Sequence, residues 1–173
     1  SEADHIRKVA PGTAVELLPF SIDIPANIAT DEARLPNCIF VGSYATVNIE
    51  AMFWLLEEVW PHVAQVRPDA RLRIIGSVGD QAPRTLPAGV DVCGIVPDLQ
   101  AEYNSASIAL VPTLYGSGLK IKLIEGLAAG LPIVATPSGA DGLLPPPPEV
   151  VAVAADNAAF AHAIVNMLAH PAL

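Results

Sequence analysis

Basic residues are scarce in this sequence. The chain of 173 residues has 9 Lys and Arg against 18 Asp and Glu, which gives a formal net charge of −9. This balance argues against a nucleic acid or an anionic membrane surface as the main partner. Long hydrophobic runs are also lacking, because no stretch of about 18 uninterrupted apolar residues is present, so we expect no membrane-spanning helix. No basic segment followed by an apolar one opens the sequence, so we expect no signal peptide.

Cysteines and clustered metal ligands are equally few. Cys38 and Cys93 are not in Cys-x-x-Cys spacing, and we expect two buried thiols in a reducing compartment, hence a cytoplasmic protein. No His, Cys or Asp cluster has the spacing of metal ligands, so we expect neither a metal nor a cofactor. The histidines, which we interpret as structural or surface residues, are His5, His62, His162 and His170.

Apolar residues make up 52% of the chain, enough for a sizeable core. Short, continuously apolar runs alternate with segments of helical periodicity, which is typical of a parallel sheet covered on both faces. The sequence therefore predicts one α/β domain: a doubly wound, Rossmann-like parallel sheet of about six strands with helices on both faces. The predicted strands are residues 37–42, 72–76, 90–94, 108–111, 131–135 and 150–153.

The longest helix is predicted to start at Asn48, whose side chain can cap it. Pro61 should kink or end this helix, because proline lacks a backbone donor and clashes with the preceding turn. Trp54 and Trp60 lie in the same segment and are expected in the core or at its rim, without a ligand role. Further helices are predicted over about residues 97–105, 119–129 and 156–170, and a stiff polyproline segment over 145–148.

Glycines follow several of the predicted strands, where sheets of this kind bind their ligands. Gly42, Gly76 and Gly94 each end a strand, and a glycine-rich loop, YGSGLKIKLIE, occupies residues 115–125. Glycines let the backbone approach a ligand, and a helix N-terminus with an adjacent lysine suits phosphate. The spacings of a Walker loop and of a dinucleotide fingerprint are absent. Gly-x-Gly alone is as typical of a structural turn as of a binding loop.

Lys120 and Lys122 are the only basic residues after Arg84, among seven acidic ones. Beside the glycine loop they indicate a phosphate site, although two solvated lysines on a helix face would look the same. Because two residues on a helix point to different sides, we expect only Lys120 to face the ligand. Glu125 lies among apolar residues of the same helix. It could contact ribose hydroxyls or simply pair with Lys122.

Residues 116–136, GSGLKIKLIEGLAAGLPIVAT, resemble the donor-binding signature of group 1, family 4 glycosyltransferases with the GT-B fold. Shorter segments match in the family's order. Residues 40–43 resemble the glycine loop that opens the C-terminal domain, residues 94–98 and 138–142 also match, and residues 18–23 resemble the segment where the chain leaves the N-terminal domain.

The resemblance implies two parts. Residues 1–36 would lead out of a missing N-terminal domain, and residues 37–173 would form a nucleotide-sugar-binding, Rossmann-like domain. The ligand would be a nucleoside diphosphate sugar, which is the donor substrate rather than a cofactor.

The resemblance also implies site residues. Glu125 matches the second glutamate of the family's Glu-x7-Glu motif, which typically holds the ribose, whereas Ser117 replaces the first. Ser43 stands where the family often has an arginine, and no lysine follows shortly after, so Lys120 and Lys122 would supply that charge from the other loop. Lys120 and Glu125 are the catalytic candidates. The implied donor-binding residues are Gly42, Ser43, Gly76, Val96, Gly116, Ser117, Gly118, Leu119, Lys120, Lys122 and Glu125.

The implied activity is transfer of a hexosyl group, with retention, from a nucleoside diphosphate sugar to a saccharide or lipid-linked acceptor in polysaccharide biosynthesis. The acceptor would bind largely on the missing domain, so this fragment alone is expected to be inactive, and the full-length enzyme could be peripheral at the inner membrane face. Two alternatives remain open: a nucleotide-sugar epimerase of the same architecture, and a non-catalytic nucleotide-binding module, suggested by Ser43 and Ser117. A receiver-like signalling domain would need acidic residues at the ends of the early strands, and none is visible.

Overall fold

Six short strands form the centre of the molecule in a computed structural model that describes residues 2–16, 21–22, 36–143 and 149–170. Every predicted strand is present, within two residues of its expected bounds. The strands are β1 (Asn37–Val41), β2 (Arg71–Ile75), β3 (Val90–Gly94), β4 (Ile108–Val111), β5 (Ile133–Ala135) and β6 (Val151–Val153).

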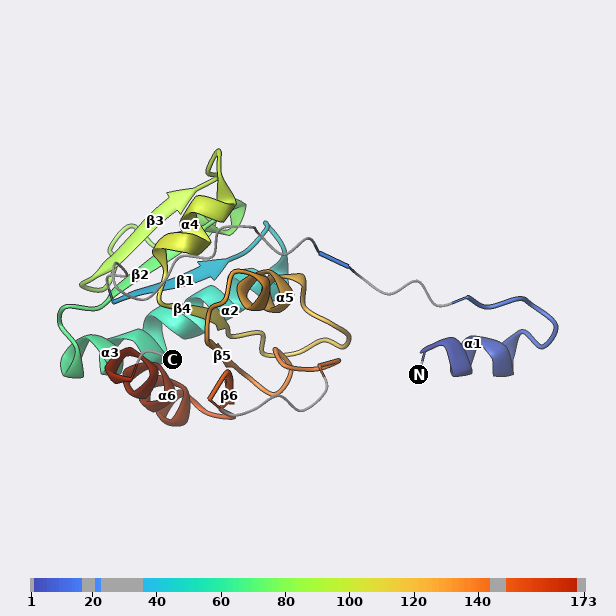
Figure 1. The fold of residues 1–173 in the computed structure, drawn as a ribbon. Helices are drawn as coiled ribbons and strands as arrows, with labels where there is room; N and C mark the ends of the chain where they lie inside the picture. The colour runs from blue at the N-terminus through green and yellow to red at the C-terminus, as the bar shows by residue number, and fades with distance from the viewer. Residues whose placement is uncertain (1, 17–20, 23–35, 144–148, 171–173) are drawn as a thin grey trace.

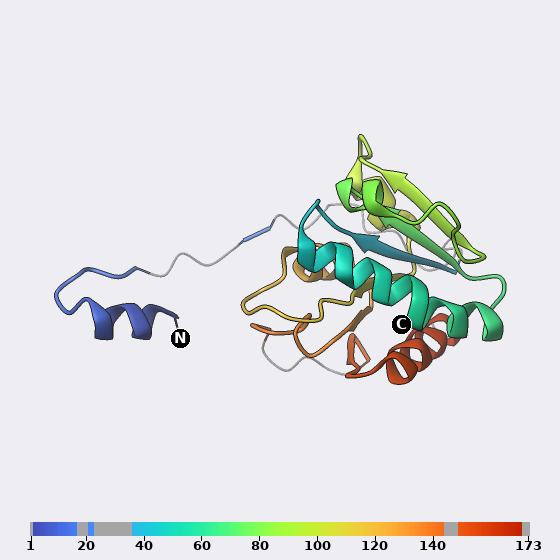
Figure 2. The same cartoon turned by 180° about the vertical axis from the view of Figure 1, so that it is seen from behind.

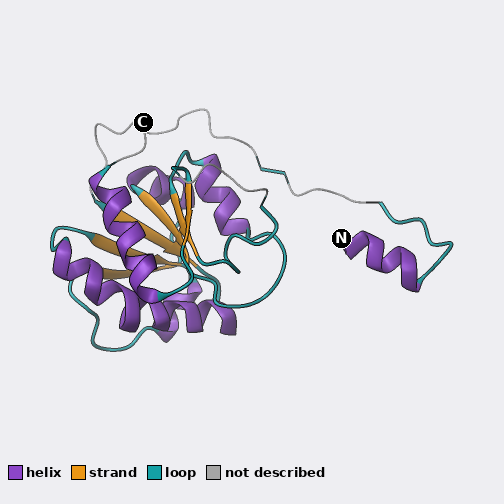
Figure 3. Ribbon diagram, turned by 90° about the horizontal axis from the view of Figure 1, so that it is seen from below, coloured by secondary structure: helices purple, strands orange, loops and turns teal. Residues whose placement is uncertain are grey.

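The strands form one all-parallel sheet in the order β3-β2-β1-β4-β5-β6. Helices cover both faces (Figures 1 and 3), so the predicted doubly wound, Rossmann-like sheet is confirmed. The strand order reverses between β1 and β4. In sheets of this kind the crevice at such a reversal, beyond the carboxyl ends of the strands, is where ligands bind.

The helical elements divide between the two faces of the sheet. The chain of α2, η2 and α3 lies with α6 on the face seen in Figure 2, and α4 and α5 lie on the face seen in Figure 1. Their bounds are α2 (Thr46–Trp54), η2 (Leu55–Val59, a π-helical turn), α3 (Trp60–Val66), η3 (Ser77–Gln81, a 3-10 turn), α4 (Leu99–Ser105), α5 (Ile121–Ala128) and α6 (Asn157–Ala169).

Alternating strand residues supply the two halves of the core. In β1, Cys38 and Phe40 pack toward α2, α3 and α6, while Ile39 packs toward α4 and α5. The same alternation separates Leu110 from Val111 in β4. Because successive side chains of a strand point to opposite faces, a continuously apolar strand fills both halves at once. Burial raises the pKa of the Cys38 thiol to about 12, which keeps it uncharged.

Pro61 does not end the helical segment that contains it. The α-helical bonding of α2 stops at Trp54, the π-helical turn η2 follows, and α3 begins with Pro61 in its first turn. Proline is tolerated there because its missing N–H would have had no acceptor. The extra residue of the π turn thus lets the helical path continue to Val66 across the proline. Trp60 is fully buried and donates its indole N–H to the carbonyl of Ala88 at 2.9 Å.

Aspartate side chains cap α4 and α6: Asp98 and Asp156 each accept a hydrogen bond from the backbone N–H three residues on. The prediction for Asn48 was wrong, because α2 begins two residues earlier, after Ala45, and has no side-chain cap.

One described helix, α1 (Glu2–Val9), was not predicted. It belongs to the predicted N-terminal part, residues 1–36, of which residues 1, 17–20 and 23–35 lie outside the described residues. Most of the segment 18–23, which resembles the exit from an N-terminal domain, therefore lies outside them. The predicted polyproline segment, 145–148, also lies outside them. The division at residue 36 stays a prediction.

Candidate functional site

A cavity of about 540 Å³ lies at the point where the strand order reverses. Its walls come from the N-terminal part of α2, the loop after β4 and the start of α5. This is the place that the fold predicts for a ligand, and its size is that of small-molecule sites. The lining residues are Val47, Asn48, Thr113, Tyr115, Gly116, Ser117, Leu119, Lys120, Ile121 and Lys122.

Gly116 and Gly118 shape the loop that borders this cavity. Their φ angles are +101° and +82°, and a Cβ added to either would meet nothing within 4 Å. These positions therefore need glycine for their backbone conformation and not for lack of space. The loop is open on its outer side, and it leads into α5, whose first N–H groups have no acceptor within the helix.

The glycines after β1 and β2 play a different part. A Cβ on Gly76 would lie 2.3 Å from the carbonyl oxygen of Gly42, and one on Gly42 would lie 3.1 Å from Val78. Gly76 also donates its N–H to the carbonyl of Gly94 at 2.6 Å. In the free domain these three strand ends pack directly on one another, so close backbone packing accounts for glycine at Gly42 and Gly76.

Lys122 lines the cavity from α5. Its ammonium nitrogen is 4.8 Å from the centre of the Phe40 ring and donates to Oδ1 of Asn48 at 2.7 Å. No ion pair between described residues involves Lys122. Burial lowers its pKa to about 8, with Lys120 adding to the effect and Glu125 opposing it. A half-buried ammonium that is hydrogen-bonded to an amide and forms no ion pair among the described residues favours an anion as its partner.

Lys120 lines the same cavity, in contrast to the expectation that only one lysine would face it. It is the N-cap residue of α5 and so lies outside the helix. Its ammonium donates to the carbonyl of Gly118 at 2.6 Å, within its own loop. The two lysines therefore bring two positive charges to one cavity, and its lining contains no carboxylate.

Asn48 connects the first glycine loop with α5. Its Nδ2 donates to the carbonyl and to Oγ of Ser43, at 3.1 and 3.2 Å, while its Oδ1 accepts from Lys122. Ser43 is thereby held beside the cavity without lining it. Asn48 was missed as a site residue because its partner lies 74 residues away, and no sequence signal joins the two.

Glu125 does not line the cavity. It is half-buried, one helical turn beyond Lys122, and accepts a hydrogen bond from the hydroxyl of Tyr103 in α4 at 3.0 Å. Burial, and then the Glu125 carboxylate, raise the pKa of that hydroxyl. Val96, also predicted for the site, is half-buried against the core under α4 and α5. The structure thus brings together Gly116, Ser117, Leu119, Lys120 and Lys122, and leaves Glu125 and Val96 beside them.

The loop after β5 packs on the glycine loop. Asp141 accepts the backbone N–H of Gly118 through Oδ2 at 2.8 Å, so this N–H is already occupied. A Cβ on Gly142 would lie 2.9 Å from the backbone nitrogen of Leu119. These contacts fix the position of the glycine loop. Among the described residues, no group of three or more His, Cys, Asp or Glu could hold a metal ion, and no helix is long and apolar enough to cross a membrane.

Residues 35–170 match the family model described as "Glycosyl transferases group 1". The chain belongs to this family. The resemblance that the segment 116–136 carries to group 1 glycosyltransferases is thereby confirmed, and the family favours a transferase over an epimerase. The six-stranded domain of this glycosyltransferase chain corresponds to the C-terminal domain of the GT-B fold.

One sequence relative and two solved structures with a similar fold are much longer than this chain. An uncharacterized 44.6 kDa protein in the cps region of Klebsiella pneumoniae is 27% identical over 162 residues, which cover 86% of this chain and 42% of that protein. A structure of TarM from S. aureus, solved with fondaparinux, alpha-GlcNAc-glycerol and UDP, has a TM-score of 0.72 at 13% identity and covers 98% of this chain and 36% of that one. HepE of Anabaena, solved with UDP and glucose, has a TM-score of 0.54 at 15% identity, and the match covers 79% of this chain and 42% of the HepE chain. The chain spans less than half of each.

Proposed function

We propose that the cavity between α2 and α5 binds the diphosphate of a nucleoside diphosphate sugar. The observation that carries this proposal is Lys122, a half-buried ammonium that forms no ion pair among the described residues, beside Lys120 and the N-terminus of α5. A diphosphate needs positive charge and backbone N–H groups, and both converge here. Two structures with the same fold, those of TarM and HepE, contain UDP, which supports a uridine nucleotide as the ligand of this chain; a guanosine nucleotide is the alternative to be tested.

In this proposal the full-length protein transfers a hexosyl group, with retention, to a saccharide or lipid-linked acceptor. Cleavage of the bond between sugar and diphosphate builds negative charge on the leaving phosphate. Lys122 and Lys120 would stabilise this charge more strongly in the transition state than in the bound donor, which is what lowers the barrier. The buried position of Lys122 adds to the effect, because charges interact more strongly where water is excluded.

Glu125 is proposed to contact the ribose of the same ligand. It is only half-buried and keeps one carboxylate oxygen, Oε1, beyond its bond with Tyr103. Its position next to the cavity, rather than in its wall, suits a part of the ligand away from the phosphates, since a carboxylate would repel them. Ser117 lines the cavity where the family's first glutamate would stand, so any contact with the donor sugar there would come from a hydroxyl.

The experiment that tests the proposal is calorimetric titration of this chain with UDP, GDP and ADP, each with and without a chelator. We expect at least one diphosphate to bind, and chelation to leave its affinity unchanged, because the two lysines supply the charge. Failure of all three nucleotides to bind would refute the donor site. Binding that disappears with the chelator would refute the metal-free mode.

Transfer itself is proposed to require more than this domain. With a nucleotide-sugar and a saccharide acceptor, the 173-residue chain should release no diphosphate above the rate in buffer, as measured by a coupled assay. Turnover by this chain alone would contradict that expectation. A longer chain that binds the donor, yet neither transfers nor epimerises the sugar, would favour the non-catalytic module.

A further inference from the structure

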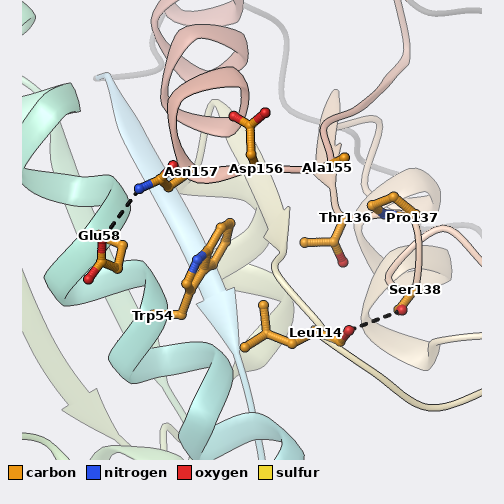
Figure 4. Close-up of a pocket in the computed structure, with 9 residues that line it drawn as sticks. All are labelled: Trp54, Glu58, Leu114, Thr136, Pro137, Ser138, Ala155, Asp156 and Asn157. Carbon is orange, nitrogen blue, oxygen red and sulfur yellow. Dashed lines mark hydrogen bonds between the residues drawn. The ribbon is translucent and has the colours of Figure 1, made fainter.

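A second cavity, of about 530 Å³, opens on the same edge of the sheet (Figure 4). It lies between α2 with η2, the loops that follow β4, β5 and β6, and the start of α6. Leu114 lines this cavity, whereas its neighbours Thr113 and Tyr115 line the first one, so the two cavities are separated by a single loop. The lining residues are Trp54, Glu58, Leu114, Thr136, Pro137, Ser138, Ala155, Asp156 and Asn157.

The charge of this second cavity is opposite to that of the first. Its lining has two carboxylates, Glu58 and Asp156, and no basic side chain, so a phosphate would be repelled. Each carboxylate has one oxygen engaged, Oε2 of Glu58 by Asn157 and Oδ1 of Asp156 by the backbone of Ala159. Their other oxygens have no donor among the described residues and can accept hydrogen bonds from a ligand.

Trp54 supplies a flat apolar wall. Figure 4 shows its ring between Glu58 and Leu114, across the cavity from Thr136 and Pro137. Phe160 fixes the position of the Trp54 ring. The two rings pack in a T-shaped contact, with their centroids 5.2 Å apart and their planes at 81°. The ring is therefore held in place before any ligand arrives, which reduces the entropy lost on binding.

We propose that this second cavity binds a neutral saccharide, as a subsite for the acceptor. A sugar ring has an apolar face of C–H groups, which an aromatic ring covers, and a rim of hydroxyls, which carboxylate and amide oxygens accept. An organic cation is the other ligand that acids and an aromatic ring could attract. Both carboxylates are exposed, however, so water and salt screen their attraction for a cation. The choice of an acceptor rests on the proposed function, since the donor would occupy the neighbouring cavity.

The two tryptophans of the chain make the test internally controlled. In an NMR spectrum of the ¹⁵N-labelled chain, the indole N–H resonance of Trp60 reports the sealed core and that of Trp54 reports the cavity. Maltose, lactose and N,N′-diacetylchitobiose are titrated to tens of millimolar, with putrescine as the cationic probe. We expect at least one saccharide to shift the Trp54 resonance saturably and to leave that of Trp60 in place. A response to putrescine alone, or no response to any probe, overturns the proposal.

Matched variants separate the saccharide contact from folding and from the donor site. Trp54→Leu should lower the affinity for the saccharide more than tenfold, as measured by ligand-detected NMR, and leave the affinity for UDP unchanged. Asp156→Asn keeps the helix cap, because Asn caps as well as Asp; together with Glu58→Gln it should weaken the saccharide several-fold. Unchanged saccharide affinity in all of these variants would refute the site. Saccharide binding without any UDP binding would refute only the donor proposal.

Discussion

Replacing Lys122 by methionine should make the free domain more stable and its diphosphate complex weaker. In the folded chain the pKa of Lys122 lies at about 8, against an ordinary 10.5. At about 1.4 kcal/mol per pH unit, this difference makes the charged form roughly 3 kcal/mol less favourable in the folded state. Methionine removes the buried charge, keeps most of the chain length and retains a favourable sulfur contact with Phe40.

The expected gain is smaller than that figure. Asn48 loses the hydrogen bond that its Oδ1 accepts, which costs about 1 kcal/mol. Hydration of this half-buried side chain reduces that cost. A net stabilisation of roughly 1–2 kcal/mol would raise the melting temperature by a few degrees in a domain of this size. Thermal unfolding at pH 7, followed by circular dichroism, measures it.

The sign of the pH dependence follows from the lowered pKa. Below about pH 8 Lys122 is charged in both the folded and the unfolded chain, and its full destabilising effect is present. Between about pH 8 and 10.5 the unfolded chain holds the proton more tightly, so the stability of the unsubstituted protein rises with pH. The stability advantage of Lys122→Met should therefore shrink over this interval and vanish above it.

The affinity for UDP should change in the opposite direction. A lost charge-assisted contact with phosphate corresponds to roughly 1.5–3 kcal/mol, or about 10- to 150-fold in Kd. Lys120→Met is the matched control, because its ammonium already donates to the carbonyl of Gly118 in its own loop; we expect a smaller loss of affinity, which added salt reduces further. A Lys122→Met protein that melts several degrees lower and binds UDP normally would show that Lys122 is structural. The donor proposal would then lose its main support.

Three further substitutions test the surrounding contacts. In Asn48→Asp the new carboxylate should pair with Lys122 and raise the pKa of the lysine, so calorimetry should show an affinity for UDP about tenfold lower or more. Unchanged affinity would mean that the charge of Lys122 does not contact the phosphates. Glu125→Gln should weaken UDP and uridine by a similar factor, with little loss of stability because the amide oxygen still accepts from Tyr103; a loss confined to UDP would contradict a ribose contact. Gly118→Ala should lower the stability in urea unfolding by about 1–2 kcal/mol, because φ is +82°; a neutral result would mean that the loop relaxes.

The fold was accessible from the sequence because short apolar runs recur between helical segments. The central strands β4 and β5 are continuously apolar and fully buried, the pattern of strands covered on both faces, whereas β2 and β3 also contain Arg73 and Asp91. β1 shows the reason in detail, since Cys38 and Phe40 fill one half of the core and Ile39 the other. The bounds of α5 were less accessible. Its helical pattern extends to Leu119, but the backbone of Lys120 is extended and the helix begins at Ile121.

That difference also explains the wrong expectation for the two lysines. Two residues apart on a helix would point to different sides, but Lys120 precedes α5 and only Lys122 is in it. Helical spacing does not relate them, and both reach the same cavity. The contact of Asn48 with Lys122 was beyond sequence reasoning for another reason. It depends on β1 and β4 being neighbours at the reversal of strand order, which places the starts of α2 and α5 side by side.

The neutrality of the groups around Lys122 is what makes its charge usable. A carboxylate in the place of Asn48 would hold the ammonium more tightly and would also compensate its charge, leaving less for a ligand. An amide and an aromatic ring orient the ammonium at 2.7 and 4.8 Å, and among the described residues it forms no ion pair. In a chain with a net charge of −9, such a site must act locally, since the surrounding field repels anions. The half-buried position of Lys122 strengthens this local attraction, because it limits screening by water and salt where the diphosphate is proposed to bind.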